Sequence, residues 1–262
     1  MIDWRSWTPG LGLLLVAAAA IPFLPGSAQS DDGAGSVIRG KVTLRGAAEA
    51  PGRAIFPENL AEKDAVMCGS KRPLITPFYA VGEDGGLGHV VVWIDDAKRN
   101  LAKNREMGAV VNENCRFLPH VQTLMVGSKV QIENHDPIMH NTHAIYQDRK
   151  ITAFNVGTPR QGQKVKKKVR RPGVLRVQCD AGHSWMRAWL HVFDHPFHRV
   201  TDADGRFELA GLPPGRHTVK AWHELSGTVE QAVEVKPGEA VEIELTFDAE
   251  PLPEGHQKGH HH

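Results

Sequence analysis

The stretch GVLRVQCDAGHSWMRAWLHV, residues 173–192, decides how this chain folds and what it can bind. Apolar side chains recur at every second position in each half, at Leu175, Val177 and Cys179 and then at Met186, Ala188, Leu190 and Val192. A period of two predicts β-strands that bury one face. We therefore expect two strands whose inward rows end at Cys179 and Met186, joined by a loop that carries His183.

Other parts of the chain show the same strand pattern. The segments SVIRGKVTLRG (36–46), GHVVVWID (88–95), SKVQIEN (128–134) and AVEIELTF (240–247) are short, rich in β-branched residues and alternate or run apolar. Gly 26 and Pro 17 supply turns between them. The sequence thus predicts an all-β protein. Residues 46–88 are predicted to be mostly loops, and residues 95–108 a short surface helix or a loop.

The N-terminus has the features of an export signal. Arg5 precedes a short apolar run from Leu11 to Leu24, and small residues up to Ala28 offer a cleavage site before Gln29. A run of about 14 apolar residues is short for a bilayer span of about 20. We expect residues 1–28 to be a cleaved signal peptide, leaving no stable membrane span; the alternative is an uncleaved anchor. A cleaved signal makes the protein periplasmic or secreted.

Three cysteines are present, and an odd number in an exported protein leaves one thiol over. Cys68 and Cys115 both lie in loop-like surroundings and can pair with each other. Cys179 would then be a free thiol. The alternative is that Cys179 is itself a disulfide partner and that the nearby histidines are surface residues.

Two motifs carry the chemistry: CDAGHSWM (179–186) and, about 40 residues earlier, NHDPIMHN (134–141). Copper that alternates between two oxidation states needs ligands that suit both, and thiolate, thioether and imidazole together meet that need. The first motif offers Cys179, His183 and Met186. His140, placed after a strand, offers a second imidazole.

These motifs resemble those of the plastocyanin-like cupredoxins, and most of all the exported bacterial proteins of the plastocyanin-like or methylamine-utilisation-like kind. The resemblance covers residues 109–195 and implies a cupredoxin-like Greek-key sandwich. It implies His140, Cys179 and His183 as equatorial copper ligands and Met186 as the axial ligand. It also implies that Asn141 ties the two ligand loops together by hydrogen bonds.

The three residues between Cys179 and His183 are more than plant plastocyanin has. This spacing resembles that of the dinuclear copper domain of cytochrome oxidase and nitrous oxide reductase, which carries a second cysteine four positions before the first. Leu175 stands there in this chain. The expected cofactor is therefore a single, mononuclear copper ion.

A second β pattern follows the first. The segment VTDADGRFELAGLPPGRHTVKAWHE (200–224) resembles the carboxypeptidase regulatory-like, transthyretin-like β-sandwich, through its turns at Asp204-Gly205 and Pro214-Gly215. That family begins with two strands that fit residues 37–108. We expect a smaller sandwich in two parts, 37–108 and 196–248, interrupted by the cupredoxin, with 249–262 as a disordered tail.

The function expected from these features is one-electron transfer by an exported copper protein that serves a redox partner protein. No catalytic triad or acid–base pair is visible in the sequence, so we do not expect an enzyme. A formal net charge of +1 argues against a nucleic-acid-binding surface. The alternatives are a copper-trafficking protein, a copper enzyme with an open coordination position, and an envelope binding module without metal.

Other polar features receive structural interpretations. His191, His195 and His198 are expected to make hydrogen bonds at a domain junction, and His143 to be a surface residue. The basic run KVKKKVRR (164–171) is predicted to be an exposed edge strand whose charges discourage aggregation. The alternative for this run is a docking patch for an acidic redox partner.

Overall fold

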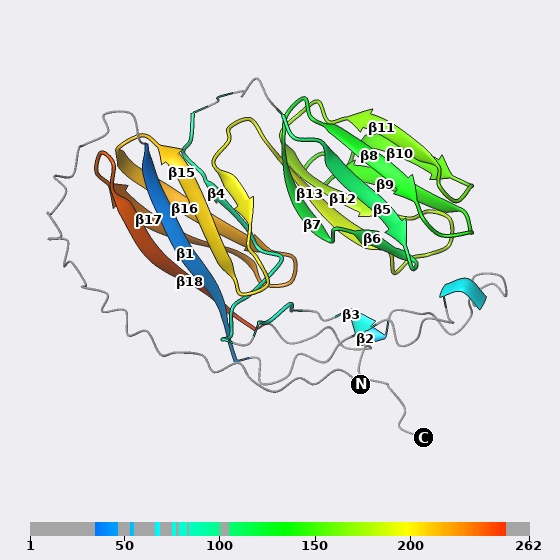
Figure 1. Cartoon of the computed structure of the whole chain (residues 1–262), viewed down its shortest axis with the longest axis horizontal. Helices are drawn as coiled ribbons and strands as arrows, with labels where there is room; N and C mark the ends of the chain where they lie inside the picture. The colour runs from blue at the N-terminus through cyan, green and yellow to red at the C-terminus, as the bar shows by residue number, and fades with distance from the viewer. Residues whose placement is uncertain are drawn as a thin grey trace, which may run out of the picture. The chain divides into compact units, whose positions relative to one another are not determined.

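A computed structural model describes residues 35–46, 53–54, 66–68, 75–76, 79–82, 84–98, 100 and 105–249. Within them the regular structure is almost entirely β-sheet, with one helical turn at residues 66–68 (Figure 1). The all-β class predicted from the sequence is confirmed. The predicted signal peptide, residues 1–28, lies outside the described residues, as does the tail beyond residue 249.

The strands are short and follow one another along the chain. They are β1 (Ser36–Arg45), β2 (Arg53–Ala54), β3 (Ile75–Thr76), β4 (Val91–Ile94), β5 (Gly108–Glu113), β6 (Arg116–Leu118), β7 (Val121–Met125), β8 (Lys129–Asn134), β9 (His140–Tyr146), β10 (Thr152–Thr158), β11 (Lys164–Lys168), β12 (Gly173–Gln178), β13 (Arg187–Phe193), β14 (His198–Val200), β15 (Arg206–Leu212), β16 (Gly215–His223), β17 (Gly227–Val235) and β18 (Ala240–Asp248).

Strands β5 to β13 form one unit, which we call the central unit. They make a five-stranded sheet of order β10-β9-β12-β13-β7 and a four-stranded sheet of order β11-β8-β5-β6. Strand β12 pairs antiparallel with both β13 and β9, so the strand that leads to Cys179 lies between the strand that begins at His140 and the strand that follows the cysteine loop. This order brings the two predicted ligand segments together at one end of the sheet.

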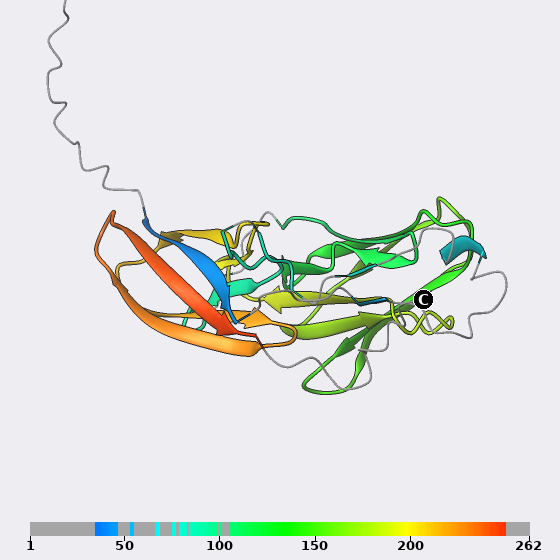
Figure 2. The same ribbon diagram turned by 90° about the horizontal axis from the view of Figure 1, so that it is seen from below.

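Strands from both ends of the chain form a second unit, which we call the interrupted unit. Its sheets have the orders β15-β1-β18 and β14-β4-β16-β17. Figure 1 and Figure 2 show the blue β1 beside the red β18, and these two strands pair in parallel from Val37 with Ala240 to Arg45 with Asp248. The chain therefore leaves this unit after β4, builds the central unit, and returns at β14.

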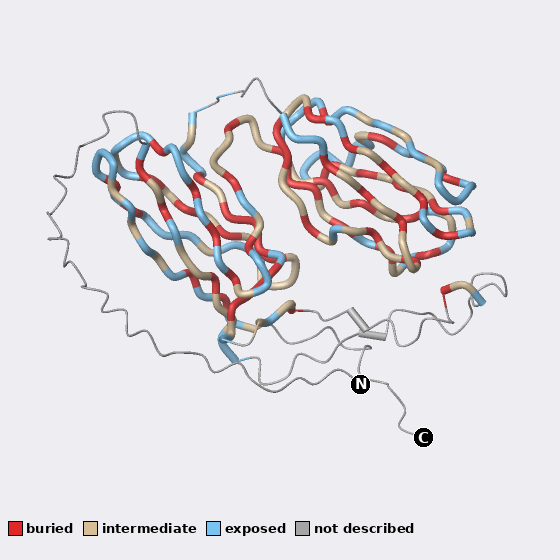
Figure 3. Tube along the Cα trace, in the orientation of Figure 1, coloured by how far each residue is buried: buried red, intermediate tan, exposed pale blue. Residues whose placement is uncertain are grey.

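Each unit has its own apolar core, and Figure 3 shows buried positions alternating with exposed ones along the strands. The alternation expected for the ligand strands is present, because Leu175, Val177, Ala188 and Leu190 are all fully buried. They join one cluster of buried residues together with Cys179 and Met186. Buried residues of β1, β4 and β15 to β18 form the other cluster.

The structure bears on the predictions made for the stretch 95–108 and for the basic run 164–171. The charged stretch 95–108 has no helix at its described positions, and β5 already begins at Gly108, inside the stretch assigned to the first part of the second sandwich. The basic run is the strand β11, which lies at the edge of its sheet with Lys164, Lys166 and Lys168 exposed, as predicted. Among the described residues, no helix is long and apolar enough to cross a membrane.

Candidate metal centre

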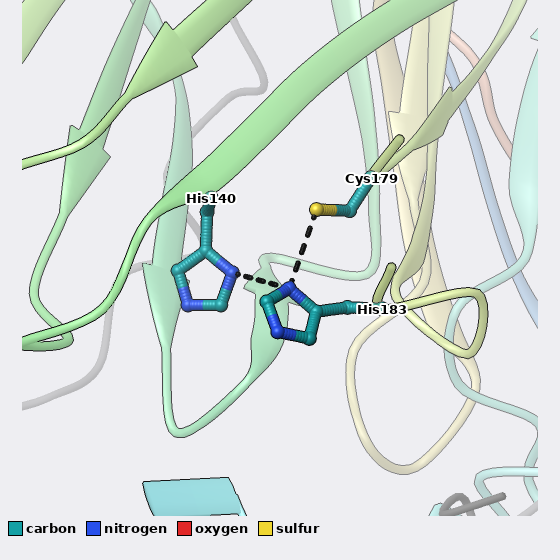
Figure 4. A group of neighbouring side chains, drawn as sticks. All are labelled: His140, Cys179 and His183. Carbon is teal, nitrogen blue, oxygen red and sulfur yellow. Dashed lines mark hydrogen bonds between the residues drawn. The ribbon is translucent and has the colours of Figure 1, made fainter. Parts of the chain in front are cut away.

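Three side chains from separate parts of the sequence converge at one end of the central unit (Figure 4). His140 is the first residue of β9, Cys179 follows the last residue of β12, and His183 lies on the loop between β12 and β13. The Nδ1 atoms of the two histidines are 3.1 Å apart, and Sγ of Cys179 is 3.5 Å from Nδ1 of His183. All three ligand atoms lie within 4.8 Å of one another.

The spacing of these atoms suits a single metal ion. A first-row metal bonded at about 2.0 Å to nitrogen and about 2.3 Å to sulfur would hold such atoms roughly 3.3–3.7 Å apart. The two distances above come close to this range. The site is also enclosed: His140 is 0%, His183 1% and Cys179 5% exposed. A thiol with two imidazoles is a donor set that suits copper, and it fits zinc as well.

The orientation of His140 is fixed from its far side. Nε2 of His140 lies 2.8 Å from Oδ2 of Asp136, which is 2% exposed. An ionised carboxylate only accepts hydrogen bonds, so this contact places a proton on Nε2, and Nδ1 is the nitrogen that faces Cys179 and His183. Carboxylates commonly orient metal-binding histidines in this way.

The pKa values around this pair follow from burial and hydrogen bonding. Burial raises the pKa of Asp136, but hydrogen bonds from His140 and from the backbone N–H groups of Cys115 and Asn114 lower it below its ordinary value. Burial lowers the pKa of His140, yet its hydrogen bonds to Asp136 and Cys179 outweigh burial and raise it. The contact is therefore a charge-assisted one.

Cys179 is set up as a thiolate. Burial raises the pKa of its thiol, but hydrogen bonds from His140, His183 and two backbone N–H groups lower it by more, to about 6. One of these backbone donors is the N–H of Asn141, 3.3 Å from Sγ. A thiolate is the form of cysteine that binds metals.

Asn141 connects the two ligand segments. Besides its backbone contact with Cys179, its side-chain Oδ1 accepts the N–H of Asp180 at 3.3 Å, and its Nδ2 donates to Oδ1 of Asn155 at 2.6 Å. The residue thus joins β9, the cysteine loop and β10 by hydrogen bonds.

Met186 closes the ligand loop. It is 1% exposed, belongs to the same core cluster as Cys179, and donates its backbone N–H to the carbonyl of His183 at 2.9 Å. The hydrogen bond turns the chain from the loop into β13. Met186 therefore lies buried at the end of the strand next to the one that ends at Cys179.

A second group of close ligand atoms involves Cys115, Asp136 and His140. The structure joins Cys115 to Cys68 in a disulfide, with a Cα–Cα distance of 5.6 Å, so Cys115 offers no thiolate. Cys179 is the free cysteine. The thiolate chemistry of the site thus belongs to Cys179.

The role of one residue that matters at this site, Asp136, escaped sequence reasoning. Asp136 stands inside the quoted NHDPIMHN motif, four positions before His140, but its role appears only once the chain turns back on itself. Trp185 packs edge-on against His183 with ring centroids 5.2 Å apart, and its Nε1 donates to the carbonyl of Cys115 at 3.0 Å. Trp189, four residues further on, instead donates to Glu224 at 2.7 Å.

Other histidines considered in the sequence are not among the three converging side chains. His143 is held between Asp180 at 2.6 Å and Thr152 at 2.7 Å, which makes it a partner of the loop next to Cys179. His195 accepts the N–H of Phe197 at 3.3 Å. The expectation of hydrogen bonds is wrong for His198, since neither ring nitrogen has a hydrogen-bond partner and the ring stacks on Phe193 instead.

Comparison with known proteins gives structural neighbours alone. No protein-family model matches the chain, and no curated protein matches it. A purple cupredoxin from Nitrosopumilus maritimus has 22% identity over 33% of this chain and 99% of its own, with a TM-score of 0.29. Auracyanin from Roseiflexus castenholzii has 13% identity over 36% of this chain and 99% of its own, with the same TM-score.

A copper-containing nitrite reductase from Thermus scotoductus SA-01 has 21% identity over 38% of this chain and 25% of its own, again with a TM-score of 0.29. The three solved structures cover 33%, 38% and 36% of this chain, in the order purple cupredoxin, nitrite reductase and auracyanin.

Proposed function

We propose that this chain is an exported one-electron carrier that binds a single copper ion through Cys179, His140 and His183, with Met186 as the fourth ligand. The observation that carries the proposal is the convergence of one sulfur and two Nδ1 atoms within 4.8 Å in an enclosed site. Two imidazoles and one thiolate with a weak thioether are the ligands of copper centres that transfer electrons. When bound, copper supplies a one-electron couple that no side chain here offers.

The residues support retention of an ion through a redox cycle. His140 opens β9, and Cys179 and Met186 adjoin the ends of β12 and β13, so three of the four ligands are anchored to paired strands. Strand backbones hold side chains more firmly than free loops do. A carrier needs this rigidity because its ligands should move little when the electron arrives.

Burial favours a carrier over an enzyme. None of the three converging side chains is more than 5% exposed, so a substrate has little direct access to the ligand atoms. His183 is 1% exposed, so it does not itself form the surface through which an electron would leave. The half-buried Trp185 packs against its ring.

Export is part of the proposal. It is supported by the signal-like N-terminus and by the Cys68–Cys115 disulfide, since disulfides persist in oxidising compartments. Intact mass of the protein purified from its native compartment should correspond to a chain that begins at Gln29. A mass that includes Met1 to Ala28 would support the anchor alternative.

We further propose that the interrupted unit resembles the carboxypeptidase regulatory-like sandwich in role as well as pattern, and presents the copper unit to a redox partner protein. The proposal is supported by the pairing of the segments that resemble that family: β1 and β4 share two sheets with β15 to β18. Deleting the central unit and joining residues 95 and 198 should leave a soluble protein that competes for the partner without carrying electrons.

The decisive experiment loads the mature protein with copper(II) and records visible and electron-spin spectra. We expect one copper per chain and an intense thiolate-to-copper absorption band, lost in Cys179→Ser. His135→Gln is the matched control, because His135 is 43% exposed, lies five residues before His140, and should leave the band unchanged. A wild-type protein that takes up no copper would support a binding module without metal.

Voltammetry then separates the remaining alternatives. A carrier should complete repeated redox cycles with its copper retained against a chelator. A trafficking protein should release the reduced ion under the same conditions. Azide that alters the copper spectrum would indicate an open coordination position and hence an enzyme.

A further inference from the structure

A tight turn next to the metal centre has an unusual residue in it. Asn114 and Cys115 form the two-residue connection between β5 and β6, and their φ angles are 53° and 55°. Hairpin turns of this kind need left-handed conformations at both central positions, which Asn and Gly adopt readily and most other residues do not. This chain has a cysteine at the second position, cross-linked to Cys68. We call residues 114–115 the cysteine turn.

The N–H groups of the cysteine turn are connected to one histidine, His140, through hydrogen bonds. Asn114 donates its backbone N–H to Oδ1 of Asp136 at 2.8 Å, and Cys115 donates to Oδ2 at 2.9 Å. The same Oδ2 atom lies 2.8 Å from Nε2 of His140. The left-handed backbone is what points both N–H groups at one carboxylate. His140 is therefore oriented by an aspartate that the turn itself holds.

The Cys115 carbonyl of the cysteine turn is connected to the other histidine, His183, through Trp185. Cys115 accepts the indole N–H of Trp185 at 3.0 Å, and the Trp185 ring meets the His183 ring edge-on at 65°. The backbone of Cys115 thus contacts both Asp136, which lies behind the His140 ring, and Trp185, which lies behind the His183 ring. The two contacts are independent, since one uses the N–H and the other the C=O of Cys115.

We propose that the cysteine turn, pinned by the Cys68–Cys115 disulfide, is the support that positions both histidine ligands, with Asp136 and Trp185 as positioning residues. The inference rests on the proposed function, because a bound metal is what gives the orientation of the imidazoles its purpose. The disulfide restricts the turn, the turn fixes Asp136 and Trp185, and these fix the Nδ1 atoms that face Cys179.

The first test needs no metal. Nitrogen-15 NMR of histidine-labelled apoprotein should show His140 as the Nε2–H tautomer, with a slowly exchanging proton. Asp136→Asn keeps the size of the side chain but no longer demands a donor, so the preference for this tautomer should be lost. Asp148→Asn is the matched control, since Asp148 is 52% exposed and pairs with Arg149. An unchanged His140 spectrum in Asp136→Asn would overturn the inference.

The second test measures copper affinity by chelator competition. Loss of a residue that orients a metal ligand typically weakens metal binding by about 10- to 100-fold, and we expect this for Asp136→Asn. Trp185→Phe keeps a ring against His183 but removes the donor to Cys115, and should cost less than Asp136→Asn. Both changes should also shift the copper reduction potential, which loss of fold stability alone would not do.

The third test asks whether the disulfide acts through these residues. Replacing both Cys68 and Cys115 by serine should weaken copper binding by about 10-fold in the wild-type background. In the Asp136→Asn, Trp185→Phe background the same replacement should cost much less, because its route to the histidines is already broken. Equal losses in both backgrounds would overturn the coupling, as would no loss in the first.

These outcomes separate the two proposals. A wild-type protein without copper uptake, but with the His140 tautomer sensitive to Asp136→Asn, would end the copper proposal and leave the support role of Asp136 standing. Copper uptake together with a His140 tautomer that does not respond to Asp136→Asn would support the copper proposal and end the support role of Asp136. Circular dichroism of each variant confirms that the strands are intact before either conclusion is drawn.

Discussion

Nδ1 of His140 lies 3.1 Å from Nδ1 of His183, and both rings are buried. Two neutral imidazoles can satisfy this contact only if one donates its proton to the other, and the Cys179 sulfur competes for the same proton at 3.5 Å. A cation placed among the three atoms satisfies all of them at once. Under the proposed function, this relationship predicts that a bound metal ion stabilises the site.

Copper should therefore stabilise the folded protein. At a free copper concentration about 1,000 times the dissociation constant, binding to the native state adds about 4 kcal/mol to the free energy of unfolding. Thermal unfolding with and without copper measures the gain. Cys179→Ser should lose most of it, while His135→Gln should keep it. A Cys179→Ser protein that copper stabilises as strongly as wild type would place the ion elsewhere.

Asn141→Ala should loosen the metal centre without emptying it. The substitution removes the contacts with Asp180 and Asn155 but keeps the backbone N–H that faces Cys179. Outer-sphere residues of this kind change metal affinity by about 10- to 100-fold, and we expect the lower end because the backbone contact with Cys179 is retained. Chelator competition measures the affinity. A larger loss than in His140→Ala would contradict the assignment of ligands.

Periodicity predicted much of this site, and for a physical reason. Alternating burial on β12 and β13 specifies which side chains face inward, so Cys179 and Met186 could be placed at strand ends from the sequence alone. The role of Asp136 could not be found this way. It depends on the β5–β6 turn packing against the segment before β9, and periodicity says nothing about which loops meet.

Contacts between elements that are distant in the sequence also explain why the surroundings of His198 were predicted wrongly. His198 looked like a hydrogen-bonding residue because histidine usually finds a partner. Its stacking on Phe193 follows from how β14 packs near the end of β13, which no local pattern reveals. The expectation of an interrupted sandwich had a different basis, since it rested on strand and turn patterns at two distant places in the sequence, around β1 and β15.

Gly40→Val should destabilise the interrupted unit. A Cβ atom at residue 40 would lie 2.5 Å from the carbonyl oxygen of Ile243 and 2.7 Å from the Phe207 ring, so β1 could no longer lie flat between its neighbours. Overpacking of this kind costs about 1–3 kcal/mol. Urea unfolding measures the loss. Gly157→Ala is the control, because its Cβ would meet only Met139, at 3.6 Å, and it should be almost neutral.

Two buried histidines should make the protein sensitive to acid. Burial lowers the pKa of His191 to about 3, with a further contribution from His198. Burial likewise lowers the pKa of His198 to about 3, assisted by the charges of His195 and Arg199. In the unfolded chain each titrates near 6.5. Above pH 6.5 both states are neutral at these residues, and the histidines do not affect the pH dependence.

As the pH falls below 6.5, the unfolded state takes up protons that the folded state does not, so the free energy of unfolding decreases until about pH 3. At pH 5 the loss is about 2 kcal/mol for each histidine. Urea unfolding of the apoprotein at pH 7, 6 and 5 measures it. His198→Phe, whose ring can keep the stack on Phe193, should remove about 2 kcal/mol of the decrease at pH 5, whereas His135→Gln should not change it. If His198→Phe retains the full decrease between pH 7 and pH 5, then His198 is not held neutral in the folded protein.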